Sequence, residues 1–507
     1  MRAKKVLKPP WGRRQKRFVK RAILHPCLSF SVPRQEPSEP TMGNGASTAR
    51  RRRHGAPPAG GGPAAAASQC DDKKPTSSPV TAPGVAYKVL LNDLARPRGV
   101  VTDAQGNLLV VEQGGKGVRR VVLDDGVGVD VCVKESAQLI DESSLNHGIA
   151  LSGDGKTLFA SSSTDVYAYS YDAAKGTAGT GKKVITGMDQ GGHATRTLLI
   201  PKHNPNLLVV SRGSDGNIDT DTTNIGSARS QLRIFEVDKL LEGNAAVEYA
   251  SGKVLGWGLR NSVGVAEDPT TGYIWSVENS IDNMKRGGDD IHNSNPGEEL
   301  NFHGLPNDTS SDVYGKNYGY PACVAIYDSS NVKDYPGGAV TGKQMVGDQM
   351  PSNYTDDFCQ KETVSPYVTF GSHLAPLDIE FQDDGSAAYI AMHGSWNRQP
   401  PNGYRLSRVS YSKGFPARPK DSQDAEERIM WNADNAECPG SCFRPVGLAL
   451  GEGGRRLYMT SDATGELYAV TGFQACGYGG MRVQVFYRWG VSARTDETRI
   501  EYCDGAV

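Results

Sequence analysis

Residues 98–112 read RGVVTDAQGNLLVVE, and they set the pattern for most of the chain. Two runs rich in Val and Leu flank a polar turn that contains Asp103, Gly106 and Asn107. Val is enriched in strands, and Gly, Asn and Asp favour tight turns. Strand-like runs joined by such a turn predict a β-hairpin.

The same pattern recurs in five further segments. The first two intervals between copies are both 49 residues, and later ones are longer because sequence is inserted between residues 298 and 359. A single hairpin cannot bury its own faces, and repetition at about 40–50 residues is typical of a propeller. Six copies therefore predict an all-β fold, a six-bladed β-propeller; the alternative is a β-sandwich with chance similarity. The further copies are HGIALSGDGKTLFASS (147–162), RTLLIPKHNPNLLVVS (196–211), NSVGVAEDPTTGYIWSVE (261–278), LDIEFQDDGSAAYIAMH (377–393) and PVGLALGEGGRRLYMTSD (445–462).

The two ends of the chain differ from the repeated body. Residues 1–86 combine basic clusters with Pro-, Ser- and Gly-rich sequence, which predicts a disordered basic head. The propeller is expected over residues 87–474, followed by an atypical tail at 475–507 that does not continue the blade pattern. The basic clusters favour a solvated tail or misassigned coding sequence over a nuclear or nucleic-acid patch.

Charge is distributed unevenly along the chain. Residues 1–60 hold 15 Lys and Arg against two acids, whereas the remainder holds 41 against 55. The acidic body argues against nucleic acid as a partner. No run of 18 or more apolar residues occurs, so no membrane-spanning helix is expected. The pattern of a secretion signal is not visible either.

Cysteines and glycosylation sequons indicate the cellular compartment in which the protein is expected to fold. Of nine Cys, Cys438 and Cys442 bracket a short Pro/Gly loop and predict a disulfide, and Cys323 and Cys359 predict a second across a Gly-, Asp- and Tyr-rich stretch. No Cys-x2-Cys pair occurs, so a zinc site is not expected. Together with two sequons, these features favour a secreted glycoprotein in an oxidising setting. The sequons begin at Asn307 and Asn353.

Polar and cationic residues precede the expected innermost strand of each blade, which places them at one mouth of the central channel. A ring of Arg and His is unfavourable unless anions neutralise it. The ring therefore predicts a ligand with several carboxylates, held by guanidinium groups; the alternative is that each Arg caps a strand or pairs with an acid. Its members are Arg98, Asn146, His147, His193, Arg196, Arg260, Asn261, His373 and Arg444.

Further polar sets follow the second strand of two hairpins. Residues 277–282, VENSID, offer carboxylate, amide and carbonyl oxygens, which calcium prefers, although such loops are also plain turns. Residues 392–398, MHGSWNR, form the other set. The stretch at 286–301 is dense in Gly, Asn and Asp and predicts a long functional loop.

Taken together, the motifs of the body resemble those of the soluble pyrroloquinoline quinone (PQQ)-dependent sugar dehydrogenases. They are most similar to the fungal pyranose and sorbosone dehydrogenase branch of that family. The resemblance covers roughly residues 86–474, and the motifs are specific only in combination. They are Gly258-Leu-Arg-Asn-Ser262, Glu278-Asn-Ser-Ile-Asp282, Asp290-Ile-His, Asn295-Pro-Gly-Glu-Glu-Leu-Asn301, Asn317-Tyr-Gly-Tyr-Pro321, His393-Gly-Ser-Trp-Asn-Arg398 and Phe443-Arg-Pro-Val-Gly447.

The resemblance implies a six-bladed propeller with PQQ in the channel mouth and a calcium ion against the quinone. PQQ is a planar tricarboxylate, which fits the cationic ring. By resemblance, His193 is the general base, and Arg260 and Asn261 lie at the reactive quinone oxygen. By the same resemblance, the backbone carbonyls of Ser280 and Ile281 would bind calcium.

Other residues resemble the family's carboxylate clamp. Arg444 matches a carboxylate-binding arginine, and Arg98 and Arg398 are weaker candidates for the same role. Bacterial glucose-oxidising members carry a second arginine two residues before the Arg444 position, where this chain has Cys442, so the clamp must differ. Three further histidines are candidates for the pocket and leave the choice of base open: His147, His373 and His393.

The implied reaction is oxidation of a reducing sugar, a pyranose, aldose or ketoaldose, at its anomeric carbon by hydride transfer to calcium-bound PQQ. Electrons would pass on to a cytochrome or small quinone, and the expected location is extracellular. One rival hypothesis is a calcium-dependent lactonase on a six-bladed propeller, which would not need the arginine ring. A binding propeller without catalysis is the other, and it would need no converging His, Arg and metal loop.

Overall fold

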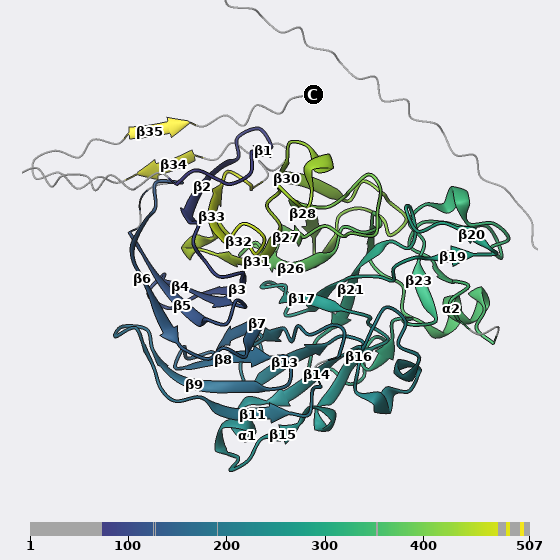
Figure 1. Cartoon of the computed structure of the whole chain (residues 1–507), viewed down its shortest axis with the longest axis horizontal. Helices are drawn as coiled ribbons and strands as arrows, with labels where there is room; N and C mark the ends of the chain where they lie inside the picture. Colours follow the sequence, from purple (N-terminus) through teal and green to yellow (C-terminus); the bar gives the residue numbers. More distant parts are fainter. Residues whose placement is uncertain are drawn as a thin grey trace, which may run out of the picture. The chain divides into compact units, whose positions relative to one another are not determined.

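The computed structural model describes residues 73–474, apart from 125, 127, 190, 351 and 352, together with two short strands at 483–486 and 497–500 (Figure 1). The head predicted to be disordered therefore lies outside the described residues up to position 72, as does most of the predicted tail.

Six sheets surround a central channel, which confirms the predicted six-bladed β-propeller (Figure 1). Their strands pair antiparallel, except for one outer parallel pair in each of two blades. Each of the six predicted hairpins supplies the two innermost strands of one blade. The innermost strands are β3 (Pro97–Thr102), β7 (Leu145–Leu151), β12 (Leu198–Leu199), β17 (Ser262–Glu267), β26 (Pro376–Phe381) and β31 (Pro445–Leu450).

The first three blades continue outward from β3, β7 and β12. Blade one adds β4 (Leu108–Glu112), β5 (Gly117–Asp124) and β6 (Cys132–Ile140). Blade two adds β8 (Thr157–Ser162), β9 (Val166–Asp172), β10 (Thr177–Ala178), β11 (Lys182–Thr186) and β15 (Val247–Glu248). Blade three adds β13 (Leu207–Arg212), β14 (Gln231–Glu236), β16 (Lys253–Trp257) and β22 (Lys316–Asn317).

The last three blades continue from β17, β26 and β31. Blade four adds β18 (Ile274–Glu278), β21 (Glu298–Gly304) and β25 (Val368–Phe370). Blade five adds β27 (Ala387–Met392), β28 (Arg405–Ser412), β29 (Phe415–Pro416), β30 (Glu426–Asn432) and β1 (Pro79–Thr81). Blade six adds β32 (Arg456–Ser461), β33 (Glu466–Thr471) and β2 (Ala86–Leu91).

Short elements decorate this framework. None of the helices in the described part of the chain has the length and hydropathy that a membrane crossing requires. Two α-helices are present in that part, α1 (Val237–Glu242) and α2 (Asp356–Glu362). The two-stranded pairs are β19 (Lys285–Arg286) with β20 (Asp289–Asp290), β23 (Cys323–Ala325) with β24 (Gln344–Val346), and β34 (Val483–Phe486) with β35 (Glu497–Ile500). The 3-10 turns are η1 (Thr220–Thr223), η2 (Ile225–Ser227), η3 (Tyr249–Ser251), η4 (Ser329–Asn331), η5 (Asn435–Glu437) and η6 (Glu452–Gly454).

Strands from the N-terminal side close the ring. β2 pairs antiparallel with β33 as the outer strand of blade six, and β1 pairs with β30 at the edge of blade five. The ordered body therefore begins before the predicted boundary at residue 87. β1 is hard to predict, because its three residues, PVT, form only an edge strand within a Pro- and Ser-rich stretch.

The blades are apolar on both faces because each packs between two neighbours. Leu108, Leu109, Val110 and Val111 in β4 are all fully buried, so the strand is a continuous apolar run and does not alternate. Between blades four and five, the fully buried Trp275 packs edge-on against Tyr411, with ring centroids 5.4 Å apart. These layers hold the inner strands at fixed positions.

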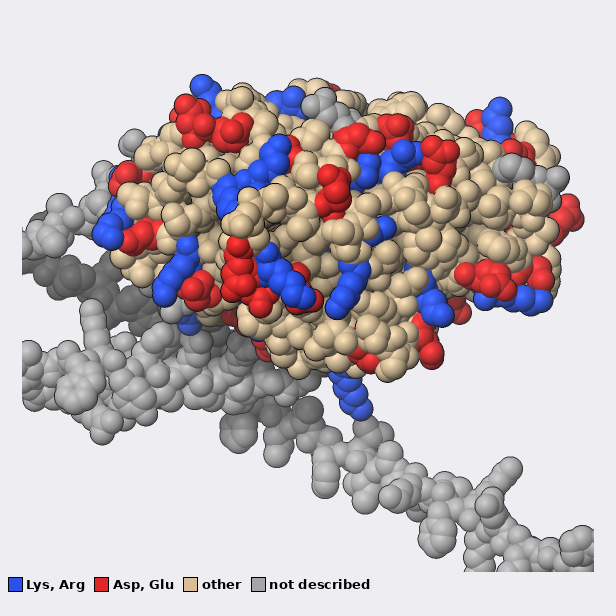
Figure 2. Space-filling model, turned by 90° about the horizontal axis from the view of Figure 1, so that it is seen from below, with Lys and Arg blue, Asp and Glu red and all other residues tan. Residues whose placement is uncertain are grey.

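Neighbouring inner strands approach each other so closely that glycine is required between them. A Cβ built on Gly447 of β31 would lie 2.3 Å from the carbonyl oxygen of Arg98 on β3. A Cβ on Gly99 would lie 2.4 Å from the carbonyl oxygen of His147 on β7. The predicted mouth residues therefore sit on tightly packed backbone. On the side of the molecule seen in Figure 2, basic and acidic side chains are interspersed.

We predict that Gly447→Ala destabilises the protein, because the added methyl must push β31 away from β3. Overpacking of this kind costs about 1–3 kcal/mol. Gly440→Ala is the matched control, since its Cβ would meet only an ordinary contact at 3.6 Å. Urea unfolding of both variants measures the difference; equal stability of the two would contradict the close-packing argument.

Candidate functional site

A cavity of about 260 Å³ opens at the mouth where the inner strands begin. It brings together six of the residues singled out from the sequence, which come from four different blades or their connecting loops. Those six are His193, Arg260, Asn261, Ser280, His373 and Arg444. The other lining residues are Asn279, Asp282, Glu298, Ala375, Gly394, Ser395, Trp396, Tyr404 and Pro439.

The tautomer of His193 is fixed by Ser214. His193 Nδ1 lies 3.0 Å from the backbone carbonyl oxygen of Ser214 and 2.9 Å from its Oγ. A carbonyl oxygen only accepts, so Nδ1 carries the proton. Ser214 Oγ in turn donates to the carbonyl of Gly216 at 2.7 Å. The unprotonated Nε2 is thereby left available as a proton acceptor.

Burial, together with the positive charge of Arg260, lowers the pKa of His193 to about 4. The ring is therefore neutral at physiological pH, which is the state that a general base requires.

Arg260 is held in one orientation by four acceptors. Its Nε and Nη2 donate to the backbone oxygen and Oδ1 of Asn217 at 3.2 and 3.0 Å. Nη2 also donates to Asp282 Oδ2 at 3.0 Å, and Nη1 donates to the Asn279 carbonyl at 3.3 Å. The Arg260 side chain is only 6% exposed, so its charge is fixed beside the cavity and paired with Asp282.

The loop that contains Ser280 and Ile281 is pinned to the propeller. Ser280 N–H donates to Glu298 Oε2 at 2.7 Å, and Asn279 Nδ2 donates to the Pro376 carbonyl at 2.5 Å. Ile281 is 2% exposed and packs in a hydrophobic cluster. Burial raises the pKa of Glu298 to about 7. The loop therefore offers oxygen atoms in a fixed frame, the donor type that calcium prefers.

His373 faces the same loop from the strained start of blade five. Its φ is +62°, in the left-handed region that is costly for a residue with a Cβ, and such strain is typical of functional sites. His373 Nε2 donates to the His292 carbonyl at 2.8 Å, which leaves a lone pair on Nδ1. Nδ1 lies 3.7 Å from Asp282 Oδ1, so two acceptors face each other, an arrangement that suits a cation or water.

A second network, centred on Asp462, adjoins the cavity. Asp462 accepts from Arg98 Nη1 at 2.7 Å and from His393 Nε2 at 2.9 Å. Arg444 Nη2 lies 2.9 Å from His393 Nδ1, so the ring accepts from Arg444 and donates to Asp462. Burial alone would raise the pKa of Asp462, but His393 and Arg98 hold it well below its ordinary value.

The remaining predicted residues lie around this network or away from the cavity. His147 is buried and accepts from Arg98 Nε at 3.3 Å, and burial holds its pKa well below the usual range. Arg398 donates to the carbonyls of Asn293 and Ser372 at 2.6 and 3.4 Å and does not line the cavity.

The predicted ring of unpaired cations is therefore only partly present. Arg98 pairs with Asp462, and Arg196, 1% exposed, donates to backbone carbonyls. For these two the alternative interpretation holds. Arg444 differs, because its Nε and Nη2 meet only carbonyls and the ring of His393.

Both predicted disulfides are present, Cys323–Cys359 and Cys438–Cys442. Cys442 is 2% exposed and bonded to Cys438, so its position provides no cation. The small disulfide loop brings Pro439, five residues before Arg444, to the cavity.

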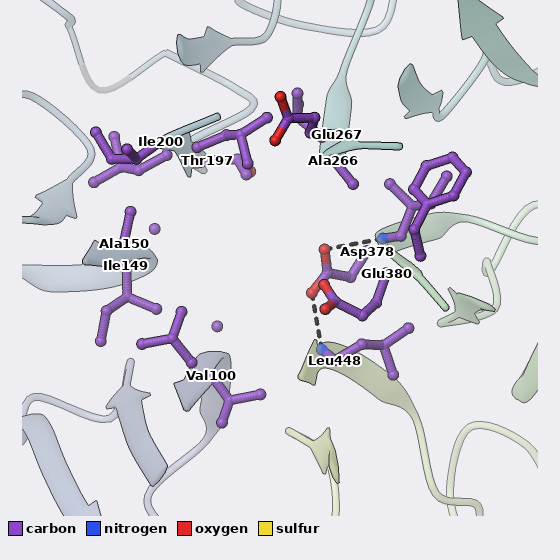
Figure 3. Close-up of a pocket in the computed structure, with 18 of the residues that line it drawn as sticks. Val100, Ile149, Ala150, Thr197, Ile200, Ala266, Glu267, Asp378, Glu380 and Leu448 are labelled. Carbon is purple, nitrogen blue, oxygen red and sulfur yellow. Dashed lines mark hydrogen bonds between the residues drawn. The ribbon is translucent and has the colours of Figure 1, made fainter. Parts of the chain in front are cut away.

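A second cavity, of about 200 Å³, lies deeper among the inner strands (Figure 3). Asp378 accepts from the N–H groups of Leu448 and Ile379 at 2.8 and 2.9 Å, and Glu380 lies beside it. Burial raises the pKa of Asp378 to about 7 and that of Glu380 to about 8. Carboxyl groups outnumber cationic side chains in the lining of this cavity, so the mouth cavity is the better match for a polycarboxylate.

Sequence reasoning missed several residues of the site. Asp462 had a usable signal, because it follows the second strand of its hairpin, as the predicted polar sets do in blades four and five. Ser214 and Asn217 had none, since their roles depend on pairings with distant segments.

Comparison with known proteins supports this assignment of the fold. Residues 79–472 match the TrAA12-like family. A pyrroloquinoline quinone-dependent sugar dehydrogenase of Hypocrea jecorina (strain QM6a) is 41% identical over 396 residues, which are 78% of this chain and 89% of that protein.

A pyrroloquinoline quinone-dependent pyranose dehydrogenase of Coprinopsis cinerea is 37% identical over 404 residues, covering 77% of this chain and 54% of that protein. The chain thus spans about half the length of this relative.

Two solved structures are similar over most of the chain. A calcium structure of Trichoderma reesei carbohydrate-active enzymes family AA12 has a TM-score of 0.77 at 42% identity and covers 79% of this chain and 99% of its own. The holo form of the PQQ domain of pyranose dehydrogenase from Coprinopsis cinerea has a TM-score of 0.74 at 36% identity, with coverages of 79% and 99%. Because the matching region takes in all six blades and every residue around the mouth cavity, the chain belongs to the TrAA12-like family, and the resemblance inferred from its motifs is confirmed.

Proposed function

We propose that this protein oxidises a reducing sugar at its anomeric carbon, using PQQ and calcium at the mouth cavity. The substrate class is a pyranose, aldose or ketoaldose. The observation that carries the proposal is the pairing of a neutral His193, with its free Nε2, and a fixed Arg260 at one cavity.

The chemistry of the lining residues fits PQQ. Its carboxylates suit Arg444, whose Nη1 makes no hydrogen bond within the described part of the chain, and charge-assisted bonds of this kind are strong. Calcium suits the pinned loop, where the backbone carbonyls of Ser280 and Ile281 would be ligands. The names of similar proteins, which mention PQQ, support the same choice.

Bound PQQ would supply the quinone that accepts a hydride from the sugar. The protein's own part is proton transfer and charge stabilisation. His193 Nε2 takes the proton of the anomeric hydroxyl, and Ser214 keeps the ring in the tautomer that can do so. Arg260, already oriented by Asn217 and Asp282, stabilises negative charge as it develops without reorganising.

The reduced protein must then pass electrons to an acceptor, for which we propose a cytochrome or a small quinone. We further propose that the protein is secreted. The disulfides Cys323–Cys359 and Cys438–Cys442 support this, as do two exposed sequon residues, Asn307 and Asn353.

His193→Ala should slow sugar oxidation about 10²–10⁴-fold, because a general base is lost. PQQ and calcium binding should stay within threefold of the parent, since His193 holds neither. Single-turnover reduction of bound PQQ measures the step without the acceptor. His147→Ala and His393→Ala are the comparisons; if one of them slows reduction and His193→Ala does not, the base is misassigned.

The protonation state of His193 gives a second test. With its pKa lowered to about 4 from an ordinary 6.5, the ring should stay neutral as pH falls through 6 and 5 and gain its proton only near 4. The base form, and any rate that depends on it, is present above pH 4 and lost below. NMR titration of the cofactor-free protein, with His193→Ala to assign the signal, measures this; protonation near pH 6.5 would be the contrary result.

Arg444→Ala and Arg260→Ala should each weaken PQQ binding. Loss of one charge-assisted hydrogen bond costs about 1.5–3 kcal/mol, or about 10- to 150-fold in Kd. Arg398→Ala is the control, because Arg398 donates to carbonyls away from the cavity and should change Kd by less than threefold. Fluorescence titration with PQQ gives the values, and unchanged affinity in both test variants would mean that the two arginines are purely structural.

A further inference from the structure

The loop at residues 213–219, between β13 and η1, contacts both halves of the site. At one end, Ser214 fixes the tautomer of His193, and its N–H donates to the Arg260 carbonyl at 2.8 Å. Three residues later, Asn217 reaches the guanidinium of Arg260 and the loop at 279–282. One short loop therefore contacts the base, the arginine and the loop proposed to bind calcium.

Both polar atoms of the Asn217 side-chain amide, and the backbone carbonyl oxygen of Asn217, take part in these contacts. Its Oδ1 accepts from Arg260 Nη2 at 3.0 Å and from the N–H of Asp282 at 2.7 Å. Its Nδ2 donates to the Asp282 carbonyl at 2.9 Å, and its own carbonyl accepts from Arg260 Nε at 3.2 Å. Asn217 thus both donates a hydrogen bond to the Asp282 backbone and accepts one from it, and it accepts two further hydrogen bonds from Arg260.

An ion pair and several hydrogen bonds hold the loop itself in place. Arg229 donates to both carboxylate oxygens of Asp219 at 2.6 and 2.8 Å, and Asp219 Oδ2 accepts from the N–H of Asp215 at 2.9 Å. Tyr320, 3% exposed, accepts from Asp219 N–H at 2.7 Å and donates to the Asn217 carbonyl at 3.1 Å. Asn217 is therefore held in place before any ligand binds.

We propose that Asn217 is a positioning residue that couples Arg260 to the loop at 279–282. Through this coupling, one side chain fixes the position of the arginine relative to the carbonyls proposed to bind calcium. The purpose of this coupling rests on the proposed function, because Arg260 and that loop would contact two parts of one cofactor. Asn217 itself is not placed against the cofactor.

An amide suits this role better than a carboxylate. A second carboxylate beside Asp282 would place two like charges near one guanidinium and would repel an anionic cofactor. The neutral amide orients Arg260 without neutralising it, and it also supplies a donor for the Asp282 carbonyl. Arg260 thus keeps one charge partner, Asp282, and its orientation is set by Asn217.

The test compares Asn217→Ala, Asn217→Ser and Asn217→Asp with Thr220→Ala, an exposed neighbour in the same region, as control. PQQ titration in the presence of calcium should give a Kd about tenfold weaker for Asn217→Ala. In an Arg260→Ala background the same change should cost less than threefold, because the arginine that Asn217 orients is already gone. Equal losses in both backgrounds would overturn the proposal.

A second readout needs no cofactor. The Asp282 amide donates to Asn217 Oδ1, so its hydrogen exchange should accelerate at least tenfold in Asn217→Ala and stay near the parent rate in Asn217→Asp, which keeps the acceptor. Exchange at Val277 in β18 monitors the fold. Unchanged exchange at Asp282 in Asn217→Ala would overturn the coupling. If the parent protein fails to bind PQQ, the proposed function fails, and the exchange result still decides whether Asn217 holds the loop.

Discussion

Neighbouring inner strands of the propeller lie in close backbone contact, and this contact fixes the positions of the residues at the mouth. Gly99 and Gly447 leave no room for a side chain between adjacent strands, so the backbones that carry Arg98, His147 and Arg444 are held against one another. Blade-to-blade packing of buried apolar strands keeps this ring closed. A cluster of charged and strained residues can persist at one mouth only because such a scaffold fixes it.

Electrostatics then determines what the mouth can bind. Asp462 and Asp282 each neutralise one arginine, and their positions set the orientation of His393 and Arg260. Arg444, in contrast, meets only neutral partners. The cavity therefore combines a histidine of fixed tautomer, an oriented cation and a cation available for a ligand, which fits the proposed oxidation of an alcohol by a bound anionic quinone.

The fold was predictable because it depends on local patterns that repeat. The pattern that predicts each hairpin is contained in about 16 consecutive residues, and six copies of it leave few alternatives to a propeller fold. The site was predictable in part, since residues that precede an inner strand share a mouth. Pairings across the ring were not: nothing local shows that Asp462 would accept from Arg98, or Asn217 from Arg260. The burial of Arg196 among carbonyls and the edge strand β1 were not predicted for the same reason, because both depend on segments far away in sequence.

The most direct test of the proposed function is reconstitution of the purified protein with PQQ and calcium, followed by dye reduction across a panel of reducing sugars. We expect sugar-dependent reduction that needs both additions and is lost when either is left out. Reduction without PQQ, or no reduction with any sugar by a folded protein that binds PQQ, would overturn the proposed function.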